Sequence, residues 1–338
     1  MDATPVWFMR QAGRYLPEYR ALRARHGFLE MATTPEIAAE VTLQPVRRLG
    51  VDAAILFADI LLPLPAMGAP IHFADGEGPV IDRPVRDAAA VEAMRVADPG
   101  DLGYVGETLR LVAADLPAGV ALIGFAGAPF TLASYLIEGG RSESFARTKL
   151  LMWNEPGLFR LLMEKLAATT AAYLAMQIAA GAQAVQLFDS WAGCLAPGDY
   201  EAHVLPHSRA VFEAVRAAGV PAIHFAADGA GLLPLLAKAG GDVLGVDWRI
   251  SLSRARELAG GVPLQGNLDP AVLLADPGAV LAATDRVLAE ARGGPHLFNT
   301  GHGLTPETPV DTVRRVVDRV HEASAGRKPG WTGGRGRA

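Results

Sequence analysis

The sequence predicts an α/β protein folded as a single (β/α)8 TIM barrel, and three observations support that prediction. Short apolar runs rich in β-forming residues alternate with longer Ala-, Leu- and Arg-rich segments of helical period. Eight runs and eight segments follow one another, which is the number this barrel needs. Of the 338 residues 50% are apolar and 20% charged, so the chain can bury a large core. A doubly wound sheet is the competing architecture, but residues 9–13, MRQAG, lack the glycine pattern of its phosphate turn.

Each expected strand is followed by an expected helix, and several of these helices open with a proline or a capping residue. The strands are expected at Val6–Met9, Ala53–Phe57, Ala121–Phe125, Ala184–Phe188, Ala222–Phe225, Val243–Val246, Leu264–Gly266 and Leu297–Asn299. The helices are expected near residues 36–48, 101–115, 155–180, 199–217, 229–239, 251–260, 271–291 and 307–323.

Two segments stand outside this alternation. Residues Leu62–Val85 carry several prolines between short alternating runs, which predicts a loop with a small hairpin over one end of the barrel. Residues 325–338 are rich in Gly, Arg, Lys and Pro and predict a disordered tail, which leaves residues 1–324 as the barrel domain.

Composition narrows the class of protein and its compartment. Lys and Arg number 31 against 36 Asp and Glu, a net charge of −5, so a globally basic nucleic-acid binder is not expected. The single cysteine, Cys194, excludes an internal disulfide and a multi-thiolate zinc site. Residues 116–137 and 166–188 are free of charge, but their Pro, Gly, Gln and Thr content indicates buried core rather than membrane spans. Residues 1–5 lack a secretory signal, so we expect a cytoplasmic protein.

Chemistry in such a barrel lies at the C-terminal ends of the strands, so the polar residues that follow each apolar run are the site candidates. Residues of these types also cap helices, and for each Asp or Ser both roles stay open. The candidates in chain order are Arg10, Gln11 and Arg14; Asp59; Tyr135; Asp189 and Ser190; Asp228; Asp247 and Trp248; Asn267 and Asp269; and His302.

The first candidates lie in a basic segment of an otherwise acidic chain. Residues 6–26 hold five arginines against the lone Glu18, a balance of 5 − 1 = +4. Arginine binds carboxylates and phosphates through two parallel hydrogen bonds. Arg10 and Arg14 flank Gly13, where a glycine beside the small Ala12 lets a ligand approach the backbone. We therefore expect an anion site at Arg10 and Arg14, and a solvated helix face for the other arginines.

Three further candidates differ in how strongly their surroundings indicate a function. Asp59 lies in the apolar stretch ILFADILL, where a buried carboxylate needs either a structural partner or a functional environment. Tyr135 fits core packing with a hydrogen-bonded hydroxyl. His302 lies between two glycines after a strand, which favours contact with a ligand. Cys194 fits a buried small hydrophobe and is assigned no chemistry.

Two long stretches carry a resemblance to a known family. Residues 5–20, PVWFMRQAGRYLPEYR, resemble the N-terminal signature of the uroporphyrinogen decarboxylase family, and residues 124–139, GFAGAPFTLASYLIEG, resemble its second signature. Shorter matches follow at FADIL (57–61), QLFDSWAG (186–193) and FNTGHG (298–303). The matches are in register and spread over nearly the whole chain.

The resemblance implies a cytoplasmic barrel, commonly a homodimer, that takes part in haem and tetrapyrrole biosynthesis without a cofactor or metal. Its members remove CO₂ from the four acetate side chains of uroporphyrinogen III and give coproporphyrinogen III. A pyrrole protonated on carbon can itself accept the electrons, so no pyridoxal or thiamine is needed. By this resemblance Asp59 would face the pyrrole NH groups, and Arg10 is assigned as the proton source. The expected contacts with substrate come from Arg10, Gln11, Ala12, Gly13, Arg14, Asp59, Tyr135, Ser190 and His302.

Two other functions remain as alternatives. A zinc- or corrinoid-dependent methyltransferase on a related barrel would need thiolate ligands, but Ala226 stands where one is expected after His224, and the chain has a single cysteine. A non-catalytic tetrapyrrole-binding protein would need the arginine pair without a working Asp59. The zinc content of the purified protein distinguishes a decarboxylase from the methyltransferase. Turnover of uroporphyrinogen distinguishes it from the binding protein.

Overall fold

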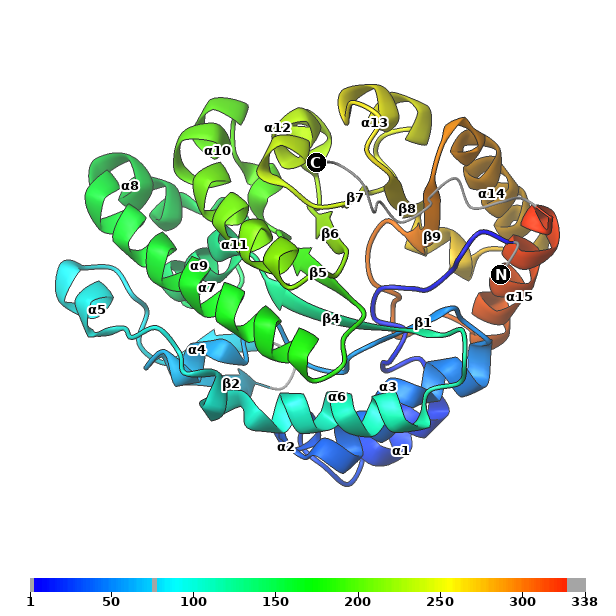
Figure 1. The fold of residues 1–338 in the computed structure, drawn as a ribbon, viewed down its shortest axis with the longest axis horizontal. Coiled ribbons are helices and arrows are strands. Elements are labelled where there is room, and N and C mark those ends of the chain that lie inside the picture. The colour runs from blue at the N-terminus through cyan, green and yellow to red at the C-terminus, as the bar shows by residue number, and fades with distance from the viewer. Residues whose placement is uncertain (1–2, 75–77, 327–338) are drawn as a thin grey trace.

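The central layer of the molecule is a curved sheet of seven parallel strands. A computed structural model describes residues 3–74 and 78–326, and Figure 1 shows its strands surrounded by helices. Hydrogen-bonded neighbours follow chain order, and every pair is parallel. The strands are β1 (Ala53–Ile55), β4 (Ala121–Gly127), β5 (Ala184–Phe188), β6 (Ala222–Phe225), β7 (Val243–Gly245), β8 (Leu264–Leu268) and β9 (His296–Thr300).

The predicted first strand, Val6–Met9, is reduced to an isolated parallel bridge between Val6 and Phe298 of β9. On one side the Trp7 N–H donates to the Phe298 carbonyl at 3.2 Å, and on the other the Asp52 N–H donates to the Val6 carbonyl at 2.9 Å. Residues 5–7 therefore close the ring between β9 and β1, and the barrel is confirmed. The prediction of a four-residue strand was wrong because the Phe8 and Met9 N–H groups donate to the side chains of Gln11 and Asn299 rather than to the backbone of a neighbouring strand, and the chain turns at Arg10.

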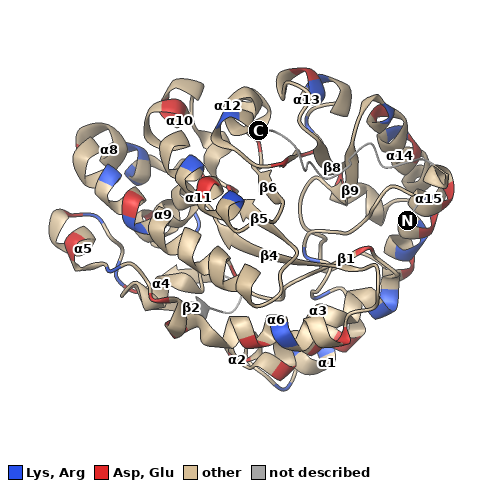
Figure 2. Cartoon of the chain, in the orientation of Figure 1, with Lys and Arg blue, Asp and Glu red and all other residues tan. Residues whose placement is uncertain are grey.

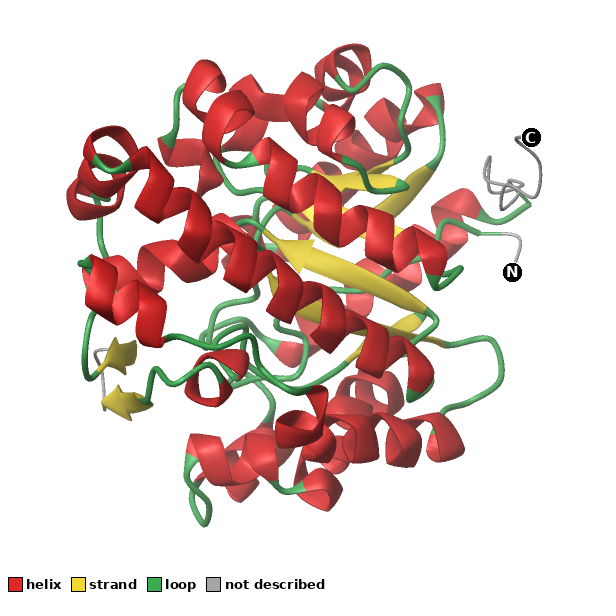
Figure 3. Cartoon of the chain, turned by 60° about the vertical axis from the view of Figure 1, so that its left-hand side comes forward, coloured by secondary structure: helices red, strands yellow, loops and turns green. Residues whose placement is uncertain are grey.

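The helices that cover the outside of the sheet begin close to the predicted positions. Figure 3 shows them enclosing the strands on all visible sides. Two predicted helices are interrupted: residues 199–217 form two helices that meet at Val204, ahead of Pro206, and residues 271–291 contain a break before Pro277. The outer helices are α3 (Pro35–Leu49), α6 (Gly103–Asp115), α9 (Pro156–Ala179), α10 (Pro197–His203), α11 (Leu205–Ala217), α12 (Leu233–Ala239), α13 (Leu252–Leu258), α14 (Pro277–Glu290) and α15 (Val310–Ser324).

Shorter elements lie between the barrel repeats. The hairpin expected within Leu62–Val85 is confirmed as β2 (Ile71–Ala74) and β3 (Gly78–Ile81). It adjoins α7, because the Ile81 N–H donates to the Gly139 carbonyl at 2.9 Å. The other elements are α1 (Pro17–Arg23), α2 (Phe28–Thr33), α4 (Pro63–Ala66), α5 (Ala88–Ala93), α7 (Pro129–Glu138), α8 (Ala146–Asn154) and the 3₁₀ turns η1 (Pro99–Leu102), η2 (Ala192–Cys194), η3 (Gly229–Leu232), η4 (Pro270–Leu274) and η5 (Ala291–Gly293).

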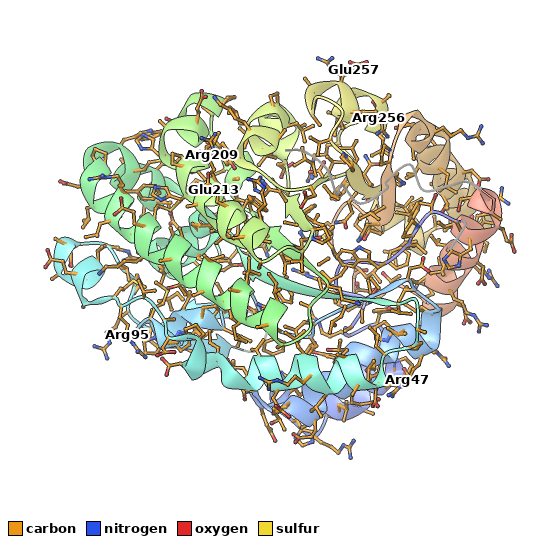
Figure 4. All side chains as sticks on the ribbon, in the orientation of Figure 1. Arg47, Arg95, Arg209, Glu213, Arg256 and Glu257 are labelled. Atoms are coloured by element: carbon orange, nitrogen blue, oxygen red, sulfur yellow. The ribbon has the colours of Figure 1, made fainter. Side chains whose placement is uncertain are left out.

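Charged residues lie outside the sheet. The seven strands contain no Asp, Glu, Lys or Arg, and Figure 2 shows the charges gathered on helices and loops. In Figure 4 the labelled Arg47, Arg95 and Glu257 lie at the periphery. Most of the buried side chains are apolar. The charge-free residues 121–137 form β4 and α7 and are mostly buried, as expected, whereas residues 117–119 are exposed. Residues 166–188 alternate buried positions with exposed ones such as 168, 175 and 179, so only part of this stretch is core.

Two predictions about the chain as a whole fare differently. Within the described part of the chain, no helix is long and apolar enough to cross a membrane. The predicted tail falls almost entirely outside the described residues, and the domain boundary at residue 324 stays a prediction.

The N-terminal ends of the strands carry a buried carboxylate, Asp52, which is 7% exposed. Its Oδ2 accepts hydrogen bonds from the Val6 N–H at 2.7 Å and from His321 Nε2 at 2.8 Å. The bond to Asp52 is the main reason why the pKa of His321 is raised above its ordinary value. Asp52 thus joins the closing segment, β1 and α15.

Candidate active site

The C-terminal ends of the strands bring most of the candidates to one end of the barrel. Arg10 follows the closing segment, Asp59 follows β1, Tyr135 lies on α7 directly after β4, Ser190 follows β5, and His302 follows β9. Since all strands are parallel, these positions share one rim.

Arg10 is held in place by its neighbours on both sides. Its φ is 60°, in the left-handed region that side chains other than glycine rarely adopt. The preceding residue is anchored twice: the Met9 N–H donates to Asn299 Oδ1 at 3.0 Å, and the Met9 carbonyl accepts from the Leu304 N–H at 2.9 Å. Such strained backbone persists only where surrounding bonds hold it, and it is frequent at functional sites.

Gln11 is fully buried, and both ends of its side chain are bonded to the backbone. Its Oε1 accepts from the Phe8 N–H at 3.0 Å, and its Nε2 donates to the Ala53 carbonyl at 2.9 Å. The side chain therefore connects the closing segment to β1. Ala12 and Gly13 are half-buried, whereas Arg14 is exposed.

The charge of Asp59 acts on Tyr135, and the charge of Arg10 acts on both groups. Asp59 is half-buried, and its Oδ1 accepts from the Leu61 N–H at 2.8 Å. Burial raises the pKa of Asp59, while the Leu61 bond and the positive charge of Arg10 oppose that rise. Burial, helped by the charge of Asp59, raises the pKa of Tyr135 to about 12, against the opposing charge of Arg10. The three groups are therefore close enough to interact, and Tyr135 is a neutral hydrogen-bond donor at physiological pH.

His302 shares its surroundings with a second arginine. Burial lowers the pKa of His302 to about 4, and the charges of Arg10 and Arg249 add to that effect. Arg249 is bound by two carboxylates, with Nε 2.8 Å from Asp228 Oδ1 and Nη1 2.8 Å from Asp247 Oδ2. Arg249, the residue after Trp248, was not among the candidates predicted from the sequence.

Asp189 and Trp191 are both hydrogen-bonded to Thr131, and the Trp191 ring packs beside Tyr135. Asp189 is fully buried, and its Oδ1 accepts from the Thr131 hydroxyl at 3.0 Å. The same hydroxyl accepts from the Trp191 N–H at 3.3 Å. The Trp191 ring lies 5.7 Å from that of Tyr135 and 5.1 Å from that of Phe145, measured between centroids. Ser190, between the two anchored residues, is half-buried.

The remaining candidates have structural partners. Asn267 Nδ2 donates to the carbonyls of Asp247 and Ile250 at 3.0 and 2.7 Å. Asp269 caps η4 by accepting from the Ala271 N–H at 2.9 Å, which is the capping role left open for strand-end aspartates.

Possible metal ligands do not cluster in the part of the chain that the structure describes, where no three His, Cys, Asp or Glu residues are grouped to hold an ion. His224 is fully buried and packs on the Phe212 ring. Cys194 is half-buried, and burial raises its pKa to about 11, which disfavours a thiolate.

Fold and site together define a parallel α/β barrel whose C-terminal rim sets Arg10 near Asp59, a carboxylate of raised pKa. The chain belongs to the uroporphyrinogen decarboxylase family, whose family model matches residues 1–323. It is 55% identical to the uroporphyrinogen decarboxylase of Sorangium cellulosum over 324 residues, covering 95% of this chain and 92% of that one. It is 54% identical to that of Carboxydothermus hydrogenoformans over 327 residues, covering 95% and 93%. The predicted family, the enzyme class of carboxy-lyase and the place in tetrapyrrole biosynthesis are confirmed.

Solved structures of low sequence identity confirm the fold alone. A methyltransferase from Methanosarcina mazei is similar with a TM-score of 0.77 at 18% identity, covering 96% of this chain and 95% of that one. A B12-independent methionine synthase from Shewanella sp. W3-18-1 follows with a TM-score of 0.59 at 11% identity, covering 86% and 87%. These likenesses extend to the barrel architecture and carry no argument for a methyltransferase function.

Proposed function

We propose that the protein removes CO₂ from the four acetate groups of uroporphyrinogen III to give coproporphyrinogen III, without a cofactor, at the rim that holds Arg10, Asp59 and Tyr135. The observation that carries the proposal is that the three groups follow parallel strands at one rim of the barrel, where the charge of Arg10 acts on Asp59 and Tyr135 and the charge of Asp59 acts on Tyr135. A carboxylate, a cation and a neutral phenol thus stand together at this rim. Arg10 and Arg14 bind substrate carboxylates through charge-assisted hydrogen bonds.

The reaction uses the substrate as its own electron sink. Protonation of a pyrrole ring carbon makes the ring cationic, and the electron pair of the bond to the carboxylate flows into the ring as CO₂ leaves. The resulting methylene carbon takes up a proton, and the ring carbon then loses its own. Each acetate becomes a methyl group with the net uptake of one proton.

Asp59 stabilises the cation that develops on the ring, because a carboxylate fixed beside it needs no rearrangement during the reaction. That role requires an ionised Asp59, which the nearby charge of Arg10 favours against the effect of burial. A guanidinium keeps its proton in proteins. Arg10 therefore serves as proton source through a water bound to it.

The other contacts follow from the protonation states and burial of the groups at the rim. Tyr135 donates from its phenol, and neutral His302 offers one donor and one acceptor nitrogen. Ser190 contributes its hydroxyl. Gln11 acts by holding the loop through its buried side chain, while Ala12 and Gly13 offer backbone groups.

The proposal is tested by anaerobic incubation of metal-free protein with uroporphyrinogen III, followed by oxidation and separation of the products by carboxylate count. We expect stepwise appearance of seven-, six-, five- and four-carboxylate porphyrins. A folded protein that binds porphyrin but forms no product would contradict catalysis and favour the binding-protein alternative. The Arg14→Ala variant should bind uroporphyrin more weakly, and unchanged affinity would remove Arg14 from the site.

The same proposal includes a homodimer working in the cytoplasm. Leu150 and Trp153 lie three residues apart on α8 and are each about half exposed, which leaves an apolar patch on a helix that follows β4 and α7. Light scattering after gel filtration should give twice the chain mass, and Leu150→Glu should shift it toward the monomer. Cell fractionation tests the compartment.

A further inference from the structure

The side chain of Arg10 lies against Gly303, in space that any other residue type would fill. A Cβ built on Gly303 would come within 2.6 Å of Arg10 Cγ and 2.8 Å of Arg10 Nε, and closer still to Cδ. Carbon atoms in contact prefer separations of about 3.5–4.0 Å. Because Gly303 has no side chain, the aliphatic part of the Arg10 side chain has room to lie against it.

The backbone of Gly303 does not require glycine for its own conformation. Its φ is not among the positive values found at other glycines such as Gly266 and Gly240. The requirement for glycine at 303 comes from the side chain of Arg10.

The two segments are also bonded to each other. The Leu304 N–H donates to the Met9 carbonyl at 2.9 Å, so the residue after Gly303 is tied to the residue before Arg10. This bond fixes the backbone of both segments, and only the Arg10 side chain is left to move if the space is filled.

We infer that Gly303 is a positioning residue, which leaves the space for the Arg10 stem and so sets where the Arg10 guanidinium stands relative to Asp59 and His302. The inference rests on the role proposed above for Arg10. It is supported by the effect of the Arg10 charge on the pKa values of both Asp59 and His302.

A neighbouring glycine offers an instructive contrast. A Cβ on Gly301 would meet backbone atoms, with the Trp248 nitrogen at 2.7 Å and Asp247 Cα at 2.9 Å. Backbone cannot move aside as a flexible side chain does, so Gly301→Ala should destabilise the fold. Gly303→Ala should instead fold and displace Arg10.

The test is a double-mutant cycle of Gly303→Ala and Arg10→Ala, with uroporphyrin affinity measured by fluorescence and kcat/KM measured anaerobically. Gly303→Ala should weaken affinity by about tenfold in the otherwise native protein and by less than about twofold in the Arg10→Ala background, where the new methyl group has room. The melting temperature of Gly303→Ala should match that of the control variant Gly278→Ala. No atom lies within 4 Å of a Cβ added at Gly278.

The pH dependence of kcat/KM distinguishes a positioning role of Gly303 from a purely structural one, because a structural role would leave it unchanged. The titratable and charged groups that act on Asp59 or are acted on by it, among the described residues, are Arg10, Tyr135 and Tyr173. Displacing Arg10 removes the charge that favours ionised Asp59, so the acidic limb of kcat/KM should move to higher pH in Gly303→Ala, in the same direction as in Arg10→Ala.

Each failure has its own meaning. If Arg10→Ala weakens binding while Gly303→Ala does not, the inference about Gly303 is overturned and the proposed role of Arg10 stands. Equal losses from Gly303→Ala in both backgrounds would also overturn it. If Arg10→Ala binds and turns over normally, both the proposed function of Arg10 and this inference fail.

Discussion

Two carboxylates at opposite ends of one strand differ in burial and in what they are bonded to. Asp52 directly precedes β1, and Asp59 follows it. Asp52 is buried, and its Oδ2 accepts from the Val6 N–H and from His321. Asp59 accepts one backbone bond, from Leu61, and burial raises its pKa.

The difference lies in what each carboxylate is bonded to. The N-terminal ends of barrel strands serve stability, and the C-terminal ends serve catalysis. The carboxylate of Asp52 is bonded to the segment that closes the ring and to His321. In the proposed function, the carboxylate of Asp59, whose ionisation burial opposes, faces a cationic intermediate. Four predictions test this contrast, in order of expected effect.

Asp59→Asn should lower turnover by about 10²–10³-fold, because it removes the charge that stabilises the developing cation. The free energy of unfolding should stay the same or rise, since burial already disfavours the carboxylate. Anaerobic turnover and urea denaturation measure the two effects. Asp269→Asn is the matched control, a strand-end aspartate with a capping role that Asn also fills. Turnover close to that of this control would refute the role of Asp59.

Asp52→Asn should have the opposite profile, with the free energy of unfolding lowered by about 2 kcal/mol through weakened charge-assisted bonds to Val6 and His321. Turnover of the folded variant should change by less than about twofold. Denaturant unfolding and activity at the same temperature measure both. A large loss of turnover with native stability would break the division between the two ends.

Tyr135→Phe should lower turnover by about tenfold, as expected for the loss of one hydrogen bond to a charged group. With its pKa at about 12, the phenol stays protonated through the working range, so the variant should keep the pH profile of the native enzyme. A lost alkaline limb would instead indicate that Tyr135 titrates during catalysis.

His321 should make stability depend weakly on pH. Its pKa is raised in the folded state, so its contribution is complete below its ordinary pKa of about 6.5 and is lost as pH rises through the raised value. Solvent screening at this partly exposed side chain keeps the contribution below about 1 kcal/mol. His321→Gln should flatten the slope of unfolding free energy in that window, and an unchanged slope would show that another group causes it.

Much of the fold could be predicted because alternation is a local pattern. Ala184–Phe188 and Ala222–Phe225 are strands with the predicted bounds. The helix α7 was not predicted, because nearly every residue from Pro129 to Ile137 is buried and no polar face marks its period. The break at Val204 depends on Pro206, which fits the start of a helix as well as its interruption.

The strand-end rule found the charged candidates but not the bonds that hold them. Arg10, Asp59 and His302 could be selected because each follows an apolar run. The structural role of Gln11 could not, because its partner Ala53 lies 42 positions away, and no local pattern pairs the two. Arg249 is a mixed case, because its partner Asp247 is two residues away, whereas its second partner Asp228 comes from the preceding barrel repeat.

The way the ring closes has a consequence for the order of events during synthesis. Met9 is bonded to Asn299, 290 positions later. The segment around Arg10 is therefore synthesised near the start of translation, and its partner Asn299 near the end. Closing so long a loop is entropically costly and comes late in folding. A nascent chain therefore carries Arg10 and Asp59 before the ring has closed and brought them to one rim. The proposed site is therefore complete only once the last strand, β9, has been made.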